Sequence, residues 1–340
     1  MKTKILDTKN GVYDESINQA ADILKSGGIV AIPTETVYGL AASAYSDESI
    51  KKVFIAKGRP QDNPLIVHIS DIKMLYEVAV DIPQKALECA EKFWAGPLTM
   101  VLKRAKRIAP SVSAGLDTVA VRMPSERVAR DIIKASGLPL AAPSANTSGK
   151  PSPTTYKHVA DDLDGKIDAI VSGDDCTVGV ESTVISLVGE KPKLLRPGAV
   201  TLEQLREILP DIEVDKAVLS KPEKDEKVSS PGMKYKHYAP KTDTYLVEGK
   251  TEDFVNFVNK KENSLAVCFL EEAKNIKTQK IVYGSTLDES TLARNLFKVL
   301  RNADGFGVKQ IYVHAPSKTG VGLAVYNRLI RAAAYKVISL

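Results

Sequence analysis

Basic side chains stand at the ends of several apolar segments, where they could neutralise phosphate or carboxylate groups. Lys57 and Arg59 flank a glycine in KGRPQDNP, Arg122 ends the apolar run TVAVR, and Arg196 lies in LLRPG. An arginine fork matches the paired oxygens of carboxylates and phosphates, and the glycine allows backbone to approach a ligand closely. An exposed basic helix end would explain the first pair equally well. A buried Arg122 needs an anionic partner, either a protein carboxylate or a substrate carboxylate.

Hydroxyl and amide side chains are concentrated in short loops between the apolar segments. Thr36 lies in PTETVYGL, Ser144 and Asn146 in APSAN, and Ser182 in GVESTV. Such groups bond polar substrate atoms without crowding them, and loops at strand ends are where α/β proteins place ligands. Each loop alone also fits an ordinary capped turn. His68 lies within an apolar strand, where a histidine is more often a satisfied core residue than a ligand.

Composition and the absence of common motifs limit the classes of function that fit this sequence. The sequence has no GxxxxGK[ST] loop, GxGxxG turn, HExxH or GxSxG motif. Its three cysteines are widely spaced, which fits buried apolar residues in a reducing compartment better than a metal or disulfide framework. A net charge of +5 fits a phosphate-rich ligand or RNA, and it fits an ordinary enzyme as well. No apolar signal core or membrane-spanning run is present, so we expect a cytoplasmic protein.

The 340 residues suffice for two domains. Residues 1–209 predict a mixed α/β domain, 210–241 a linker or lid, and 242–340 a smaller parallel α/β domain. In the first domain we expect strands at 29–32, 65–69, 98–103, 118–122, 140–142, 169–172, 182–188 and 193–196, and helices at 17–26, 48–56, 83–93, 128–136 and 202–208. In the last we expect strands at 244–247, 265–270, 280–283 and 310–314, and helices at 251–258, 287–303 and 323–334.

Taken together, the motifs resemble a known family. PTETVYGLAA, KGRPQDNPLIVH, AVRMP, APSAN, GVESTV and LLRPG occur in the order of the YrdC-like family, and SPGMKYKHYAP followed by an α/β domain is similar to its longer Sua5 branch. The resemblance covers essentially the whole chain. It implies an α/β fold with a YrdC-like twisted mixed sheet around a deep basic cavity, plus a smaller Rossmann-like parallel α/β Sua5 domain.

The resemblance also implies an activity, that of an L-threonylcarbamoyladenylate synthase. Such an enzyme converts L-threonine, bicarbonate or CO2, and ATP with Mg2+ into threonylcarbamoyl-AMP and pyrophosphate. A downstream tRNA threonylcarbamoyl transferase then uses the product for the t6A modification at position 37 of tRNAs that read ANN codons.

Residue roles follow from the same resemblance. The family's lysine-x-arginine and serine-x-asparagine signature falls on the catalytic candidates Lys57, Arg59, Ser144 and Asn146. The candidates for threonine binding are Thr36, His68, Arg122, Ser144 and Ser182. The candidates for ATP binding are Arg59, Asn63, Thr118, Ala142, Ser152, Arg196 and His237. No residue of the chain is predicted to bind a metal, because the sequence has no dense carboxylate cluster and Mg2+ is expected on the phosphates and waters.

The chemistry of these residues suggests how they would act. We expect Arg122 to hold the threonine carboxylate and Arg196 to neutralise phosphate charge, while residues 229–241 act as a lid that protects the short-lived carbamate from water.

Two alternative functions remain open. One is a carbamoyltransferase of the same superfamily, although the acyl-phosphatase and zinc-finger regions of such proteins are not visible here. The other is a non-catalytic RNA-binding module with salt-sensitive affinity; weak RNA binding is also compatible with the synthase.

Overall fold

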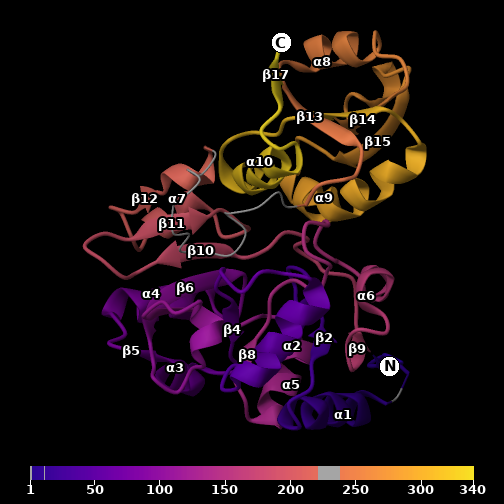
Figure 1. The fold of residues 1–340 in the computed structure, drawn as a ribbon. Coiled ribbons are helices and arrows are strands. Elements are labelled where there is room, and N and C mark those ends of the chain that lie inside the picture. Colours follow the sequence, from indigo (N-terminus) through magenta and orange to yellow (C-terminus); the bar gives the residue numbers. More distant parts are fainter. Residues whose placement is uncertain (1, 11, 221–237) are drawn as a thin grey trace. The chain divides into compact units, whose positions relative to one another are not determined.

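The computed structural model describes residues 2–10, 12–220 and 238–340, which form two compact units (Figure 1). Unit 1 comprises residues 1–148, 152–177 and 181–234, and unit 2 comprises residues 149–151, 178–180 and 235–340. The predicted ATP contact His237 lies outside the described residues, as does most of the predicted lid. No helix in the described part of the chain is both long and apolar enough to cross a membrane.

Unit 1 is built on one mixed sheet of twelve strands. Along the sheet the order is β1-β9-β2-β3-β8-β4-β7-β6-β10-β11-β12, and β5 also pairs with β6. The strands are β1 (Lys4–Asp7), β2 (Val30–Ile32), β3 (Gly39–Ser43), β4 (Ile66–His68), β5 (Ala79–Val80), β6 (Leu98–Arg104), β7 (Thr118–Arg122), β8 (Leu140–Ala141), β9 (Ala169–Ser172), β10 (Thr183–Ser186), β11 (Lys193–Arg196) and β12 (Glu213–Val214). Because strands distant in sequence become neighbours, motifs from the whole unit meet on one sheet.

The helices of unit 1 follow ordinary start and stop signals. They are α1 (Tyr13–Lys25), α2 (Asp47–Lys57), α3 (Ile72–Val78), α4 (Gln84–Phe93), α5 (Arg127–Ser136), α6 (Tyr156–Leu163) and α7 (Leu202–Arg206). The Ser46 side chain accepts a hydrogen bond at the start of α2, and Gly58 ends that helix with φ 59°. α5 buries Val128, Ala129, Ile132 and Ile133 on one stripe, which is the spacing of an amphipathic helix.

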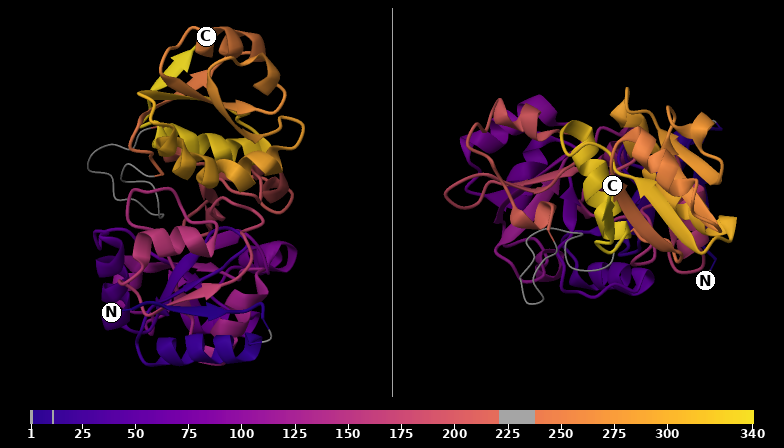
Figure 2. Two further views of the ribbon diagram at one scale, coloured as in Figure 1. Left: turned by 90° about the vertical axis from the view of Figure 1, so that its right-hand side faces the viewer. Right: turned by 90° about the horizontal axis from the view of Figure 1, so that it is seen from above.

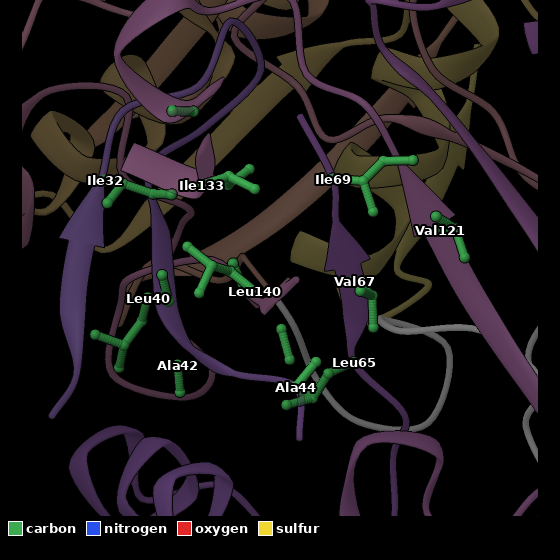
Figure 3. Close-up of a cluster of buried hydrophobic side chains, with 14 of the residues drawn as sticks. Ile32, Leu40, Ala42, Ala44, Leu65, Val67, Ile69, Val121, Ile133 and Leu140 are labelled. Carbon is green, nitrogen blue, oxygen red and sulfur yellow. The ribbon is translucent and has the colours of Figure 1, made fainter. Parts of the chain in front are cut away.

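The two faces of the central strands have different neighbours. Alternate residues of β4 and its flanks, Leu65, Val67 and Ile69, point into the main core with Val121 of β7 (Figure 3). Each of these fully buried apolar side chains stabilises the fold by about 1.5–3 kcal/mol. Side chains alternate across a strand, so Ile66 and the other residues between them face the opposite side. That opposite face carries the site described below.

Unit 2 is a smaller α/β sandwich (Figure 2). Its five strands, β13 (Asp243–Glu248), β14 (Ser264–Phe269), β15 (Gln279–Gly284), β16 (Gln310–His314) and β17 (Val337–Ser339), run parallel in the order β15-β14-β16-β13-β17. Helix α8 (Thr251–Val258) lies on one face of the sheet, and α9 (Glu289–Ala303) and α10 (Gly320–Ala332) lie on the other (Figure 1). The predicted fold class, a mixed α/β sheet with a smaller parallel one, is confirmed.

A buried polar pair occupies the carboxyl edge of the sheet in unit 2. The His314 ring, at the end of β16, contacts the Glu272 carboxylate through Nδ1, and its Nε2 lies 3.0 Å from the Gly249 carbonyl oxygen. Glu272 is fully buried, and Phe254 stacks on the ring. Both ring nitrogens face oxygens, so the ring has a hydrogen-bond partner on each side.

Candidate active site

Strand register brings several predicted threonine-binding residues together at one end of a sheet face. His68 pairs with Arg122 across β4 and β7, and Arg122 pairs with Thr99 across β7 and β6. Ser182 immediately precedes β10, and its hydroxyl lies 2.7 Å from the Thr99 hydroxyl. Residues opposite each other in neighbouring strands share a face. His68, Thr99, Arg122 and Ser182 therefore form one buried polar group.

The predicted nucleotide contact Thr118 lies at the other end of the same face. It stands four residues before Arg122 in β7, so it shares the face and lies about 13 Å away along the strand. Between the two ends is a small buried apolar cluster, made by Ile66, Val101, Ala120, Val184 and Leu195. The face thus has a polar end, an apolar middle and a second polar end at Thr118, an arrangement that suits a long ligand with distinct chemical parts.

Each guanidinium nitrogen of Arg122 contacts a protein group. Its Nη1 donates to the Thr36 hydroxyl at 2.8 Å and its Nε to the Gly96 carbonyl at 3.3 Å. Nη2 lies 2.8 Å from a carboxylate oxygen of Glu35, and the two side chains are only 4% and 6% exposed. Burial raises the pKa of Glu35, but the charge of Arg122, its hydrogen bond to the carboxylate and backbone hydrogen bonds from Ser125 and Glu35 together outweigh burial, so the net shift is downward. Of the two partners that the sequence left open for Arg122, the protein carboxylate is present.

His68 is neutral at physiological pH. Its Nδ1 lies 3.2 Å from the Ile66 carbonyl oxygen, and since a carbonyl can only accept, Nδ1 carries the proton in this contact. Burial, helped by the positive charge of Arg122, lowers the pKa of His68 to about 3. A neutral imidazole beside Arg122 can bond a hydroxyl or an amine without adding charge to the site.

Lys57 ties two of the signature motifs together. It is the last residue of α2 and is 2% exposed. Its ammonium contacts the Ser144 carbonyl, donates to the Asn146 carbonyl at 2.7 Å, and lies 3.5 Å from the Asn146 amide oxygen. The Ser144 hydroxyl donates to that same amide oxygen at 2.6 Å. Burial and the charge of Arg59 lower the pKa of Lys57 well below its usual range, while the charge of Asp162 opposes this shift. Lys57 thus organises the APSAN loop.

Arg59 and Asn63 lie beyond the end of α2. The Arg59 guanidinium is 3.3 Å and 3.4 Å from the Asn63 and Pro64 carbonyl oxygens and 5.8 Å from the centre of the Phe54 ring. Asn63 is 2% exposed, and neither polar atom of its side-chain amide has a hydrogen-bond partner among the described residues. A buried amide in that situation is normally satisfied by a ligand or by water, which makes Asn63 a strong binding candidate.

The remaining predicted ATP contacts join this network from other motifs. The Ser152 hydroxyl donates to the Glu181 carboxylate at 2.6 Å. Arg196 donates to the Ser182 carbonyl at 3.0 Å and to the Ser182 hydroxyl at 3.1 Å, so it borders the polar end of the face. Ala142 follows β8, and its amide bonds the carbonyl of Ile66 at 2.9 Å.

Three residues of this network carried no assigned role in the sequence. Glu35 lies in the motif PTETVYGL and Glu181 in GVESTV. In the sequence, the one feature that marks them is a carboxylate among apolar residues. Thr99 lies in the buried strand LTMVL and gave no signal at all. Across the described parts of both units, no group of three His, Cys, Asp or Glu side chains is arranged to hold a metal ion.

The fold and this residue set define a YrdC-type protein. A family model for Sua5, YciO and YrdC proteins, described as "Telomere recombination", matches residues 22–198. A second model, described as "Threonylcarbamoyl-AMP synthase, C-terminal domain", matches residues 200–334.

Curated relatives and solved structures agree with these models. The threonylcarbamoyl-AMP synthase of Pyrococcus abyssi is 43% identical, covering 99% of this chain and all of the relative, and that of Bacillus subtilis is 44% identical, covering 96% and 95%. The crystal structure of P. abyssi Sua5 with L-threonine superposes with a TM-score of 0.90 at 40% identity, covering 99% of this chain and 100% of that one. The chain therefore belongs to the Sua5 family of threonylcarbamoyl-AMP synthases, enzymes of tRNA t6A modification. The family and activity implied by the motifs are confirmed.

Proposed function

We propose that this synthase seats L-threonine at the Arg122 end of the sheet face and ATP along the face toward Thr118. The observation that carries the proposal is the register of β4, β6 and β7, which gathers His68, Thr99 and Arg122 at one end and leaves Thr118 at the other. Two substrates that meet between these ends would be held in line for reaction, which lowers the entropic part of the barrier.

The polar end has the groups that an amino acid requires. The Arg122 fork matches a carboxylate, and the hydroxyls of Thr36, Ser144 and Ser182 can bond the amine and the side-chain hydroxyl. A site that bonds a substrate hydroxyl rejects analogues that lack it, because its own polar groups would be left unpaired. The L-threonine complex of the P. abyssi relative supports this choice of ligand.

The candidates for ATP binding include the groups that a nucleotide requires. Arg196, which borders the polar end, and Arg59 would neutralise phosphate oxygens, and the unpaired amide of Asn63 would bond the nucleotide. With Thr118, Ala142 and Ser152 they would form the deep basic cavity expected from the sequence; His237, outside the described residues, remains a predicted ATP contact. Mg2+ would enter as part of MgATP, held mainly by phosphates and water.

The reaction follows from this arrangement. The threonine amine attacks CO2, forming a C–N bond and releasing a proton, which gives the N-carboxylate. One oxygen of that carbamate attacks the α-phosphorus of ATP, and the bond to the β-phosphate breaks to release pyrophosphate. With bicarbonate as the source, the amine would displace water in place of releasing that proton. Such a transfer needs positioning and charge neutralisation more than covalent help. The product would pass to a tRNA threonylcarbamoyl transferase in the cytoplasm.

Arg122→Lys tests the assignment, because lysine keeps the charge and loses the fork. We expect the KM for threonine to rise about 30- to 150-fold, the equivalent of about 2–3 kcal/mol for a hydrogen bond to a charged group. The KM for ATP should change less than threefold in the same pyrophosphate-release assay. Arg127→Lys, at an exposed arginine of α5, is the matched control. Equal increases in both KM values would contradict the assignment.

A further inference from the structure

Glu35 is a buried carboxylate without an assigned role. It is 5% exposed, and one of its oxygens lies 2.8 Å from Nη2 of Arg122. The backbone N–H groups of Ser125 and Glu35 also act on the carboxylate, but apart from the ion pair no hydrogen bond of standard geometry reaches either of its oxygens, or Nη2, within the described residues. Buried carboxylates normally accept several hydrogen bonds, so this pair has unused bonding capacity on both of its charges.

An amino acid presents two opposite charges to such a site. Its carboxylate and ammonium are attached to the same carbon, so the protein groups that bind them must also be adjacent. Burying either charge without a counter-charge is costly. Arg122 offers the positive partner, and Glu35 offers the negative partner directly beside it. A zwitterion entering this neutral pair leaves the site neutral, whereas without Glu35 the complex would hold one uncompensated positive charge.

Other polar groups near Arg122 fit the ammonium less well. Thr36, Thr99 and Ser182 offer only neutral hydroxyls, and His68 is neutral as well. Glu181 is engaged by the Ser152 hydroxyl. Glu35 is therefore the carboxylate that contacts the arginine assigned to the substrate.

We propose that Glu35 is a positioning and specificity-determining residue that pairs with the α-ammonium of the amino-acid substrate while Arg122 holds its carboxylate. The inference rests on the proposed function, since it takes Arg122 as the carboxylate contact. Burial raises the pKa of Glu35, but the charge of Arg122 and the hydrogen bonds to the carboxylate together lower it, so Glu35 is a weak base and acts in binding. Its removal should therefore raise the KM for threonine more than it lowers kcat.

The test compares two ligands in two variants. Glu35→Gln keeps the shape and removes the charge, and 3-hydroxybutyrate is threonine without its amine. We expect Glu35→Gln to raise the KM for L-threonine 10- to 100-fold in pyrophosphate release. The inhibition constant of 3-hydroxybutyrate against threonine should not rise and should fall, because that ligand has no ammonium to lose and its carboxylate then neutralises the uncompensated Arg122 charge. Glu91→Gln, at an exposed carboxylate of α4, is the control and should change neither value.

The outcomes separate a contact from a purely structural role. Equal weakening of both ligands, or an unchanged KM for threonine, would overturn the inference. ATP affinity measured by calorimetry reports whether Glu35→Gln is folded. If it is not, Glu35→Asp, which keeps the charge and shortens the side chain, should show the same selective loss of threonine. An unchanged threonine KM in Arg122→Lys would instead refute the proposed function, so the two failures are distinguishable.

Discussion

Replacing Lys57 by methionine distinguishes a structural lysine from a direct substrate contact. The ammonium contacts three buried oxygens, two of them carbonyls of the Ser144 to Asn146 loop. Two strong charge-assisted hydrogen bonds contribute about 1.5–3 kcal/mol each, and methionine recovers about 1–2 kcal/mol by relieving the buried charge and packing its own side chain. We therefore expect the free energy of unfolding to fall by about 3 kcal/mol.

The assay is thermal and urea unfolding followed by circular dichroism. For a unit of this size, 3 kcal/mol corresponds to a Tm lower by about 6–12 °C. Lys52→Met, on the same helix, removes a single exposed bond to the Gly27 carbonyl and should cost less than about 0.5 kcal/mol. If Lys57 instead served only as a phosphate contact, Lys57→Met would leave stability unchanged or raise it while ATP affinity fell. That result would refute the reasoning.

Two further predictions concern buried ionisable groups. His68 has a folded-state pKa of about 3, below its ordinary value of about 6.5. Between about pH 6.5 and pH 3 the unfolded chain therefore binds a proton at His68 and the folded chain does not, which favours unfolding. The stability of the wild type should thus fall from pH 6.5 toward pH 3 more steeply than that of His68→Gln in urea titrations; parallel curves would contradict the shift. In unit 2, Glu272→Gln replaces the buried carboxylate that contacts Nδ1 of His314 by an amide and should cost about 1–3 kcal/mol. Hydrogen exchange should then accelerate in β16, while unchanged protection there would argue that the pair contributes little.

The sequence anticipated the regular parts of this fold well. The strand predicted at 310–314 matches β16, and the helix predicted at 128–136 differs from α5 by one residue. In both, the apolar period is strong and the flanking residues stop the element. Where the apolar pattern of the sequence is weak, it did not predict the element that the structure contains. The edge strand β1 (Lys4–Asp7) and the short helix α6 (Tyr156–Leu163) were not predicted, and Glu213–Val214, within the predicted linker, pairs with β11.

The sequence named candidate site residues but could not show which of them contact one another. Motif resemblance selected Arg122, His68 and Ser182, yet only strand order and register reveal that they meet on one face, and register between distant strands has no local signal. The same limit explains Glu35. Its carboxylate was visible in the sequence, but its pairing with Arg122 depends on the loop after β2 crossing the end of β7, which is a tertiary contact.

The most direct test is a crystal structure of the chain with L-threonine and α,β-methylene-ATP, whose carbon bridge prevents pyrophosphate release. The threonine carboxylate should lie within hydrogen-bond distance of the Arg122 guanidinium, with the α-phosphate between it and Thr118. Threonine bound away from Arg122, or a nucleotide bound off this face of the sheet, would contradict the account.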